Sequence, residues 1–422
     1  MDIVIVGAGI VGLTASLSLH QAGFRPVVYE VVRTLAPLGV GINALPHAVR
    51  ELAALGLLDE VRAAGVEIDE LVYLTARGQR IWREPRGLAA GYAWPQVAIH
   101  RGALQMLLLR AVQARLGPDA VRFGRALVDL ETGETGVTAR FSDRSSSPEE
   151  TATVRADLLL AADGIHSTVR RQFYPGEGAP VWNGVTLWRS TSRSGKVLGG
   201  RSMLWAGRAR QKFVAYPITY DAATGETLLN WICDLKDGEG AALPREDWNR
   251  PGRREDFLPR FEAWRWPGID VPALVGTSGE IFEFPMVDRD PLPRWTFGRT
   301  TLMGDAAHPM YPIGSNGATQ GIIDARAIAF HLATAPDVRT ALGRYEGDRR
   351  EATSRIVLMN RANGPDQVME LAQQRAPGPG DDLDALLPMS ERAAIANTYK
   401  AVAGFDPAAM GVASPYRLPD SA

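Results

Sequence analysis

The sequence lacks the features expected of a disulfide-bonded protein, a nucleic-acid-binding protein or a membrane protein. Cys233 is the single cysteine among 422 residues, so no intramolecular disulfide can form, which favours a reducing compartment such as the cytoplasm. The net charge of -2 provides no bulk field for nucleic acid or an anionic membrane surface. Apolar runs of about 18 or more residues are also missing, so we expect no membrane span. These absences leave small molecules as the expected partners.

The start of the chain also lacks a targeting signal. Met1 and Asp2 lead directly into an apolar run, with neither the basic region nor the cleavage site of a signal peptide. The composition, 45% hydrophobic and 22% charged, is that of an ordinary globular protein. At about 100 to 200 residues per domain, the length predicts two or three domains.

The first thirty residues carry the most regular pattern. Ile3–Val6 is a β-branched run that stops at a glycine turn, helical spacing continues over Leu13–His20, and Val27–Glu30 is again strand-like. Gly7, Gly9 and Gly12 fit G-x-G-x-x-G within this strand–turn–helix–strand unit. Glycines there admit a pyrophosphate close to the backbone, and Glu30 can accept hydrogen bonds from ribose hydroxyls. The unit predicts an adenine dinucleotide, either FAD or NAD, although the same glycines could serve packing alone.

The remaining chain alternates between helical and strand patterns. Residues 45–57, 102–116 and 318–333 have helical spacing, whereas 157–161 and 300–303 are strand-like. Aromatic-rich segments over residues 181–235, separated by Gly, Ser and Asp, predict an antiparallel sheet. Residues 375–381 have the composition of a linker.

Two further strings lie downstream, namely AADGIHSTVR at 161–170 and GDAAHPMYPIGSNG at 304–317. Together with the N-terminal glycines, they resemble the three fingerprints of the class A FAD-dependent aromatic monooxygenases, the p-hydroxybenzoate hydroxylase family. The resemblance implies an α/β fold with a Rossmann-like FAD-binding domain, a mixed or antiparallel-sheet substrate domain and a C-terminal helical segment. We predict the FAD-binding domain at 1–70, 95–175 and 277–365, the substrate domain at 71–94 and 176–276, and a helical tail at 366–422.

The same resemblance implies the chemistry. FAD would be the bound cofactor, NADH or NADPH the transient electron donor, and one atom of O2 would reach an aromatic ring through a C4a-hydroperoxide of the flavin. Asp305 would bind the ribityl chain, and N–H groups of Gly314–Gly317 would face the reduced flavin. The expected cofactor residues are Gly7, Gly9, Gly12, Glu30, Gly41, Arg101, Gln105, Asp163, Gly164, Gly304, Asp305, Gly314, Asn316 and Gly317. His308 is expected to be structural, and no metal site is expected.

The chemistry requires an apolar cleft that excludes water. Tyr216, Pro312 and Asn43 are the expected catalytic residues. The expected substrate-binding residues are Trp188, Arg189, Met203, Tyr216, Met286 and Tyr311. Arg189 could hold a substrate carboxylate through bidentate hydrogen bonds, but a structural ion pair is an equal alternative. For the aromatic and methionine side chains, core packing is the alternative role.

Longer strings are similar to the phenazine-modifying members of the family. These strings are Pro37–Asn43, Glu84–Gly87, Tyr216–Ile218, Asn230–Trp231 and Pro285–Pro293. They imply an N-heteroaromatic substrate and raise decarboxylation of an aryl carboxylate as a possible part of the reaction. A flavin-dependent halogenase, a flavin dehydrogenase that does not use O2 and a non-catalytic FAD-binding protein are the alternatives. The sequence leaves monomer and homodimer open.

Overall fold

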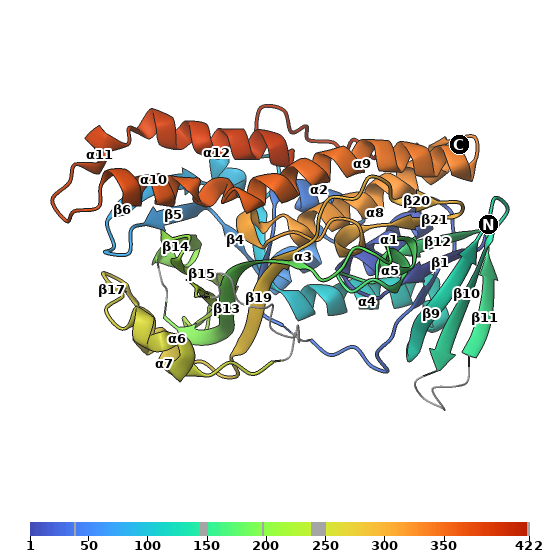
Figure 1. The fold of residues 1–422 in the computed structure, drawn as a ribbon, viewed down its shortest axis with the longest axis horizontal. Coiled ribbons are helices and arrows are strands. Elements are labelled where there is room, and N and C mark those ends of the chain that lie inside the picture. Colours follow the sequence, from blue (N-terminus) through green and yellow to red (C-terminus); the bar gives the residue numbers. More distant parts are fainter. Residues whose placement is uncertain (38, 144–150, 196–197, 238–249, 420–422) are drawn as a thin grey trace.

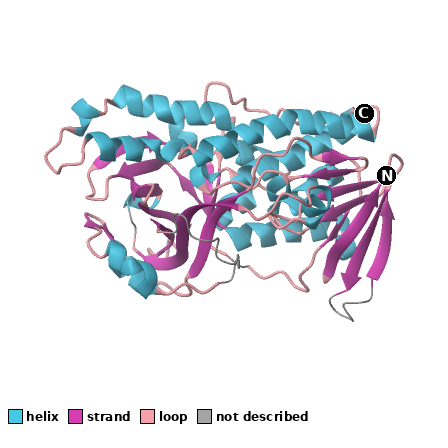
Figure 2. Cartoon of the chain, viewed as in Figure 1, coloured by secondary structure: helices cyan, strands magenta, loops and turns pink. Residues whose placement is uncertain are grey.

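The structure, a computed structural model, describes residues 1–37, 39–143, 151–195, 198–237 and 250–419. Leu38 of the Pro37–Asn43 string, residues 420–422 of the predicted tail, and residues 144–150, 196–197 and 238–249 of the predicted domains lie outside the described residues. Figures 1 and 2 show two groups of strands joined by long helices.

A six-stranded sheet in the order β20-β21-β12-β1-β2-β8 forms the first group. Its strands are β1 (Ile3–Val6), β2 (Val27–Tyr29), β8 (Val121–Arg122), β12 (Leu158–Ala161), β20 (Thr296–Phe297) and β21 (Thr300–Leu302). All pairs are parallel except β20 with β21. Every residue of β1 and β12 is buried, which is the pattern of parallel strands covered on both faces.

Helices α1 (Ile10–Gln21), α4 (Arg101–Leu116) and α8 (Gly317–Thr334) belong to this first group, where α1 packs against both α4 and α8. Two small antiparallel sheets flank it. One contains β9 (Arg125–Thr132), β10 (Val137–Asp143) and β11 (Thr151–Ala156), and the other β3 (Gly41–Ala44), β4 (Gly65–Ile68) and β7 (Gln96–His100).

The second group is a seven-stranded sheet in the order β19-β13-β16-β15-β14-β5-β6. Its strands are β5 (Glu70–Leu74), β6 (Arg80–Pro85), β13 (Val181–Ser194), β14 (Ser202–Arg208), β15 (Gln211–Tyr220), β16 (Thr227–Lys236) and β19 (Phe282–Asp288). Only the β14–β5 pair is parallel. Side chains alternate between its faces, so one face packs on the helices α6 (Arg254–Phe257) and α7 (Val271–Gly276), and the other carries side chains such as Met203, Val214 and Tyr216.

The helices after α8 run along one side of both groups (Figure 1). They are α9 (Val338–Arg361), α10 (Gln367–Arg375), α11 (Leu383–Leu386) and α12 (Met389–Ala403). The remaining elements are α2 (Pro46–Ala54), α3 (Leu58–Ala64), α5 (Thr168–Phe173), β17 (Arg265–Trp266), β18 (Ile269–Asp270) and the short 3-10 turns η1 (Gly87–Ala90), η2 (Pro118–Ala120), η3 (Leu198–Gly200), η4 (Leu258–Phe261), η5 (Gly304–Ala306), η6 (Ile313–Ser315) and η7 (Gly364–Asp366).

The predicted fold class is confirmed: an α/β body, a largely antiparallel second sheet and C-terminal helices are all present. The domain division itself stays a prediction. Its boundary at residue 277 falls before β19, yet β19 pairs with β13 in the seven-stranded sheet. The predicted tail is also packed on the body, since Arg50 donates to the Gly411 carbonyl and Tyr92 to the Phe405 carbonyl.

Candidate active site

A large cleft lies where the first glycine turn and the start of α8 meet the inner face of the seven-stranded sheet. It encloses about 1470 Å³ of space that opens to solvent. Its walls come from three distant parts of the chain, including Gly9 at the start of α1, Arg189 on β13 and Pro312 before η6. The cleft is therefore a product of tertiary packing rather than of one motif.

The glycine turn has the close packing that its motif requires. Gly7 has a φ of +100°, and a Cβ there would lie 2.5 Å from the Ala162 carbonyl oxygen. A Cβ at Gly12 would lie 1.9 Å from the Gly7 carbonyl oxygen. These two positions are closed to any side chain because the turn folds back on the strand and on itself. Their role is to shape the turn, and neither lines the cleft.

Other glycines of the three motifs face open space instead. A Cβ placed on Gly9, Gly164 or Gly317 would meet no atom within 4 Å, and all three residues line the cleft. Gly164 has a φ of +78°, which by itself favours glycine, but neither packing within the chain nor backbone conformation explains why Gly9 and Gly317 lack side chains. Close approach of a bound molecule to the backbone does. This bare cradle fits the pyrophosphate and ring of FAD.

Helix starts add a favourable potential to the cradle. Ile10 and Val11 at the start of α1, and Gly317 and Ala318 at the start of α8, line the cleft. Free N–H groups at a helix N-terminus attract phosphate and other negative charge. Arg101, the first residue of α4, also lines the cleft and adds a guanidinium that suits phosphate.

Glu30 and Gln105 hold the first turn from two sides. Glu30 follows β2 and accepts hydrogen bonds from the backbone N–H of Ala8 at 2.6 Å and of Val32 at 3.0 Å. Gln105 donates to the Ala8 carbonyl at 2.8 Å. A carboxylate has further lone pairs for ribose hydroxyls, so its predicted role remains compatible with this position.

Asp163 contacts its own turn rather than the cleft. Its carboxylate accepts from the Ser167 hydroxyl at 2.6 Å and from the Thr168 N–H at 2.8 Å, which satisfies the start of α5. Burial raises the pKa of this carboxyl. Asp163 thus positions Gly164, which has a φ of +78° and does line the cleft.

Asp305 lines the cleft, and a buried network behind it fixes its backbone, while its contact with the ribityl chain stays a prediction. Asp324 on α8 accepts from the Gly304 N–H at 2.9 Å and from Arg349 Nε at 2.8 Å. His308 Nε2 lies 2.5 Å from the same carboxylate. Burial would raise the pKa of Asp324, but the neighbouring His308 and Arg349 outweigh it and lower that pKa to about 2. His308 is thus structural, as expected, while Asp324 was not anticipated.

The loop Gly314–Asn316 is shaped from behind by the C-terminal helix α12. Gly314 has a φ of +73°, and a Cβ there would lie 1.9 Å from the Tyr399 hydroxyl. The Asn316 side chain donates to the Gly314 carbonyl at 3.1 Å and to the Tyr399 hydroxyl at 2.9 Å. It is fully buried, so it holds the loop and does not face the cleft.

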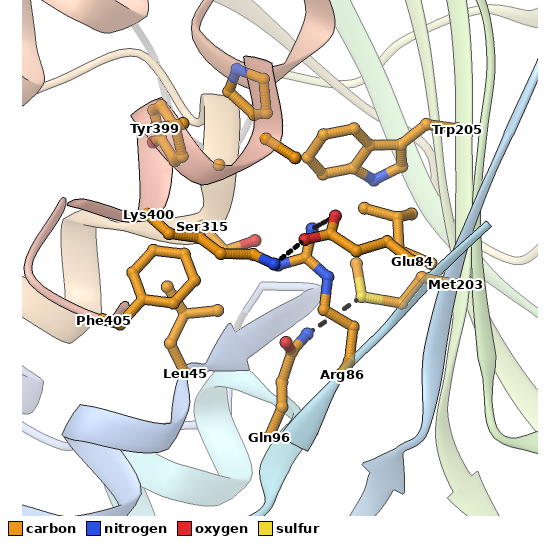
Figure 3. Close-up of a pocket in the computed structure, with 14 residues that line it drawn as sticks. Leu45, Glu84, Arg86, Gln96, Met203, Trp205, Ser315, Tyr399, Lys400 and Phe405 are labelled. Carbon is orange, nitrogen blue, oxygen red and sulfur yellow. Dashed lines mark hydrogen bonds and ion pairs between the residues drawn. The ribbon is translucent and has the colours of Figure 1, made fainter. Parts of the chain in front are cut away.

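A second, smaller cavity of about 360 Å³ lies behind this loop. Figure 3 shows Glu84 between Arg86 and Lys400, with Trp205 across from them. Glu84 pairs with Arg86 NH2 at 2.8 Å and with Lys400 Nζ at 2.5 Å, which ties β6 to α12. Trp205 lines both this cavity and the cleft. The predicted tail therefore supports a wall of the site.

Polar side chains of the sheet clamp Gly41 at one end of the cleft. Its N–H donates to Asn230 Oδ1 at 2.7 Å, and its carbonyl accepts from the Tyr216 hydroxyl at 2.7 Å and from Arg189 NH2 at 3.0 Å. Burial raises the pKa of Tyr216 to about 12, so its hydroxyl remains a donor. Arg189 Nε has no partner among the described residues, so its guanidinium retains free donor capacity.

Most of the other residues expected to act in catalysis or to bind substrate also reach the cleft. Pro312 is exposed at its surface, and Asn43, Met203 and Met286 line it. Gln96 donates to Asn43 Oδ1 at 3.3 Å, which orients that amide. The roles assigned to these residues stay predictions.

Two residues expected to bind substrate do not reach the cleft. Trp188 lies between Leu187 and Arg189 on β13, so its side chain faces the opposite side of the sheet from theirs. There it stacks on Phe257, with 5.2 Å between the ring centroids, and its indole N–H donates to Glu283. Tyr311 is 3% exposed and packs with apolar side chains behind the cleft. Core packing, the alternative role, describes both.

Three charged residues that the sequence did not single out do line the cleft. Lys212 on β15, Asp234 on β16 and Asp366 in η7 form a buried group, which we call the Lys212 cluster. Lys212 Nζ lies 2.6 Å from Asp366 Oδ2 and 3.2 Å from Asp234 Oδ2. Alternation along β15 was the available signal, since Lys212, Val214 and Tyr216 share a face.

Two other kinds of feature, a membrane-spanning helix and a metal-holding group of side chains, are absent from the described residues. These residues contain no helix long and apolar enough to cross a membrane. They also contain no group of three or more His, Cys, Asp or Glu side chains placed to hold a metal ion. The fold and the cradle together define a dinucleotide-binding protein.

Comparison with known proteins specifies the family. A family model described as an FAD binding domain matches residues 1–196 and 268–359. The chain is 46% identical over 363 residues, covering 85% of this chain and 89% of the relative, to a phenazine 1,6-dicarboxylic acid hydroxylase of Lysobacter antibioticus. It is 31% identical over 367 residues to 3-hydroxybenzoate 6-hydroxylase 1 of Aquipseudomonas alcaligenes, covering 85% and 88%. The chain belongs to this FAD-binding family of FAD-dependent aromatic monooxygenases.

Solved structures agree on the fold. A salicylate hydroxylase in complex with its substrate matches with a TM-score of 0.73 and 22% identity over 97% of this chain and 96% of that one. Klebsiella pneumoniae HpxO, with FAD and uric acid, matches with a TM-score of 0.76 and 24% identity over 97% and 98%. FAD is therefore the cofactor. The relatives lend no support to the halogenase or dehydrogenase alternatives.

Proposed function

We propose that this monooxygenase hydroxylates a planar N-heteroaromatic acid of the phenazine type, with NADH or NADPH as the electron donor. The proposal is supported chiefly by the 46% identity to a phenazine 1,6-dicarboxylic acid hydroxylase over 85% of this chain. The cleft supports it as well, because apolar side chains such as Val214, Ile232 and Met286 lie beside Arg189, whose Nε has no hydrogen-bond partner among the described residues.

The chain's own residues have defined tasks in this reaction. Bound FAD supplies the redox chemistry, accepting electrons and activating O2. Gly9, Gly164 and Gly317 admit the cofactor to the backbone, and the starts of α1 and α8 stabilise its negative charge. The apolar side chains of the sheet exclude water from the ring.

Arg189 is proposed to orient the substrate by pairing with its carboxylate. Its NH2 is fixed by the Gly41 carbonyl at 3.0 Å, so the guanidinium is held in place before substrate arrives. Tyr216 keeps the same carbonyl in position and thus acts as a positioning residue for Arg189. The chain contains one dinucleotide fingerprint, so we propose that the nicotinamide donor docks transiently. Monomer and homodimer both remain compatible with this scheme.

The test is a product assay with the FAD-loaded protein. Phenazine-1-carboxylate and phenazine-1,6-dicarboxylate are supplied with NADH or NADPH, and nicotinamide oxidation, O2 uptake and product mass are recorded. The proposal predicts faster oxidation with substrate and a product that contains one added oxygen. CO2 release in step with O2 uptake would mark decarboxylative hydroxylation, whereas a retained carboxylate would mark simple hydroxylation. Oxidation that yields no oxygenated phenazine would refute the proposed substrate class.

A further inference from the structure

The Lys212 cluster is placed to contact a ligand in the cleft. Lys212 and Asp234 are direct cross-strand partners on β15 and β16, and Asp366 reaches them from η7. All three residues line the cleft, and the two aspartates are each 3% exposed. The cluster thus lies in the floor of the site and not on the outer surface.

The cluster contains more acceptor capacity than its own lysine can satisfy. One ammonium faces two carboxylates, at 2.6 Å from Asp366 and 3.2 Å from Asp234. The Oδ1 atoms of both aspartates are buried and have no hydrogen-bond partner among the described residues. Burial raises the pKa of Asp234, and Lys212 offsets this only in part. Buried acceptors without partners are unfavourable, so a donor supplied from the cleft would stabilise the cluster.

A purely structural ion pair does not account for this composition. A single carboxylate would be enough to neutralise Lys212 and to tie η7 to the sheet. The second carboxylate leaves the group with either an excess negative charge or an extra proton. An anion would be repelled by that charge, and an apolar group would leave the free oxygens unpaired. A hydrogen-bond donor is the ligand chemistry that fits.

Two members of the Lys212 cluster and two of the residues that clamp Gly41 lie on the same two strands, β15 and β16. Along β15, Val214 separates Lys212 from Tyr216, and along β16, Ile232 separates Asp234 from Asn230. At about 3.3 Å per residue, the two polar ends are about 13 Å apart along the strands. A fused-ring molecule lying on Val214 and Ile232 with an acidic group toward the Gly41 end would point its far edge at the cluster.

We propose that the Lys212 cluster, through Asp234 and Asp366, selects substrates that carry a hydroxyl or amino group on the ring edge remote from the Gly41 end of the cleft. This inference rests on the proposed function, because it assumes a ring substrate in the cleft. Asp234 and Asp366 are then specificity-determining residues that accept a hydrogen bond from the substrate. Their contribution is a preference between ligands and not a step in oxygen transfer.

The test compares two probes with the same ring. 1-Hydroxyphenazine and 1-methoxyphenazine are titrated into the FAD-loaded protein, and binding is followed by perturbation of the flavin absorbance. In the wild-type protein the hydroxy compound should bind at least about tenfold more tightly, which is the scale of a hydrogen bond to a charged acceptor. In Asp234→Leu the ratio should fall to within about threefold, with the affinity for the methoxy compound little changed.

Controls keep the result interpretable. Asp234→Ala and Asp366→Ala also remove the acceptor, and they decide the question if Asp234→Leu does not fold. Asp288→Asn removes a buried, ion-paired carboxylate outside the cleft and should leave the wild-type ratio intact. An unchanged ratio in the Asp234 and Asp366 variants, or an equal fall in Asp288→Asn, would overturn the inference while leaving the proposed function standing. If neither probe perturbs the wild-type flavin, the inference and the proposed substrate class both fail.

Discussion

The hydroxyl of Tyr399, on the last helix, accepts a 2.9 Å hydrogen bond from the side-chain amide of Asn316, in the loop that precedes α8. The same hydroxyl lies 2.9 Å from Asn360 Oδ1 and 3.2 Å from the Ile313 carbonyl, to which it can donate. One buried phenol thus joins α12, α9 and the glycine loop. The C-terminal segment is part of the scaffold that shapes the cofactor site.

Removing this hydroxyl should loosen the loop. Tyr399→Phe keeps the ring but removes the hydroxyl that donates to the buried Asn360 Oδ1 and accepts from the Asn316 amide, which should lower the free energy of unfolding by about 1 to 3 kcal/mol. FAD affinity should fall as well, because the loop loses a fixed shape. Thermal unfolding and FAD titration of the apoprotein measure both effects. Wild-type values for both would show that the loop does not depend on α12.

The two kinds of glycine in the first turn should respond differently to alanine. At Gly12 a methyl group would overlap the Gly7 carbonyl, so Gly12→Ala should destabilise the protein by about 1 to 3 kcal/mol even without cofactor. At Gly9 it would enter open space, with an ordinary φ of -70°. Gly9→Ala should therefore leave the stability of the apoprotein unchanged within about 0.5 kcal/mol and weaken FAD binding at least about tenfold. Calorimetry of the apoprotein measures the effect on stability, and FAD titration measures the effect on cofactor affinity. Equal FAD affinity in Gly9→Ala and the wild-type protein would show that the cofactor does not approach Gly9.

Val11 fills the space that two later glycines leave. A Cβ at Gly321 would lie 2.4 Å from Val11 Cγ2, and one at Gly304 would lie 2.8 Å from it. Gly321→Ala should cost about 1 to 3 kcal/mol, and the double variant Val11→Ala/Gly321→Ala should recover part of that loss. Chemical denaturation of the four proteins gives the coupling free energy. Additive losses would contradict direct contact at this crossing of α1 and α8.

Arg189 offers a test of substrate orientation. Arg189→Ala should raise the apparent KM for an aryl carboxylate by about 10- to 100-fold, because a hydrogen-bonded charge pair is lost. The apparent KM for the same ring without a carboxylate should change little, and this comparison serves as the internal control. Steady-state nicotinamide oxidation provides both values. An equal rise for both substrates would assign Arg189 to the structure of the Gly41 clamp alone.

His47 should make the protein sensitive to acid. It is 2% exposed, and burial, with Arg50 and Arg349 nearby, lowers its pKa from 6.5 to about 3. The unfolded chain therefore binds a proton before the folded one does as pH falls, so stability is full above pH 6.5 and declines toward pH 3. Between pH 7 and 5 this group accounts for a loss of about 2 kcal/mol. In urea denaturation, His47→Gln should not show this loss of stability between pH 7 and 5. Parallel pH profiles of the free energy of unfolding for the two proteins would contradict the assignment to His47.

Local patterns were enough to predict much of the fold. The strand–turn–helix–strand unit from Ile3 to Tyr29 appears where the apolar spacing placed it, because short-range sterics and burial determine it. Trp188 could have been placed correctly as well. Strand alternation puts it on the face opposite Arg189, so the two cannot both reach the cleft.

Other features depend on contacts between distant segments, for which the sequence carries no local signal. Asp366 and Tyr399 reach the site because α9, with 24 residues, carries the chain back across both sheets. The 366–422 segment therefore looked like a separate tail, although its residues support or line the cleft. Asp324 was missed for the same reason, since its partners lie 16 to 25 residues away, outside α8.

The proposed reaction places one atom of O2 on a heteroaromatic acid in the cleft. Mass spectrometry after turnover of phenazine-1-carboxylate under 18O2, with the FAD-loaded protein and NADH or NADPH, decides whether it occurs. We expect a hydroxylated phenazine that carries one 18O atom, with substrate-dependent nicotinamide oxidation. Nicotinamide oxidation that yields hydrogen peroxide and unlabelled phenazine under every substrate condition would contradict it.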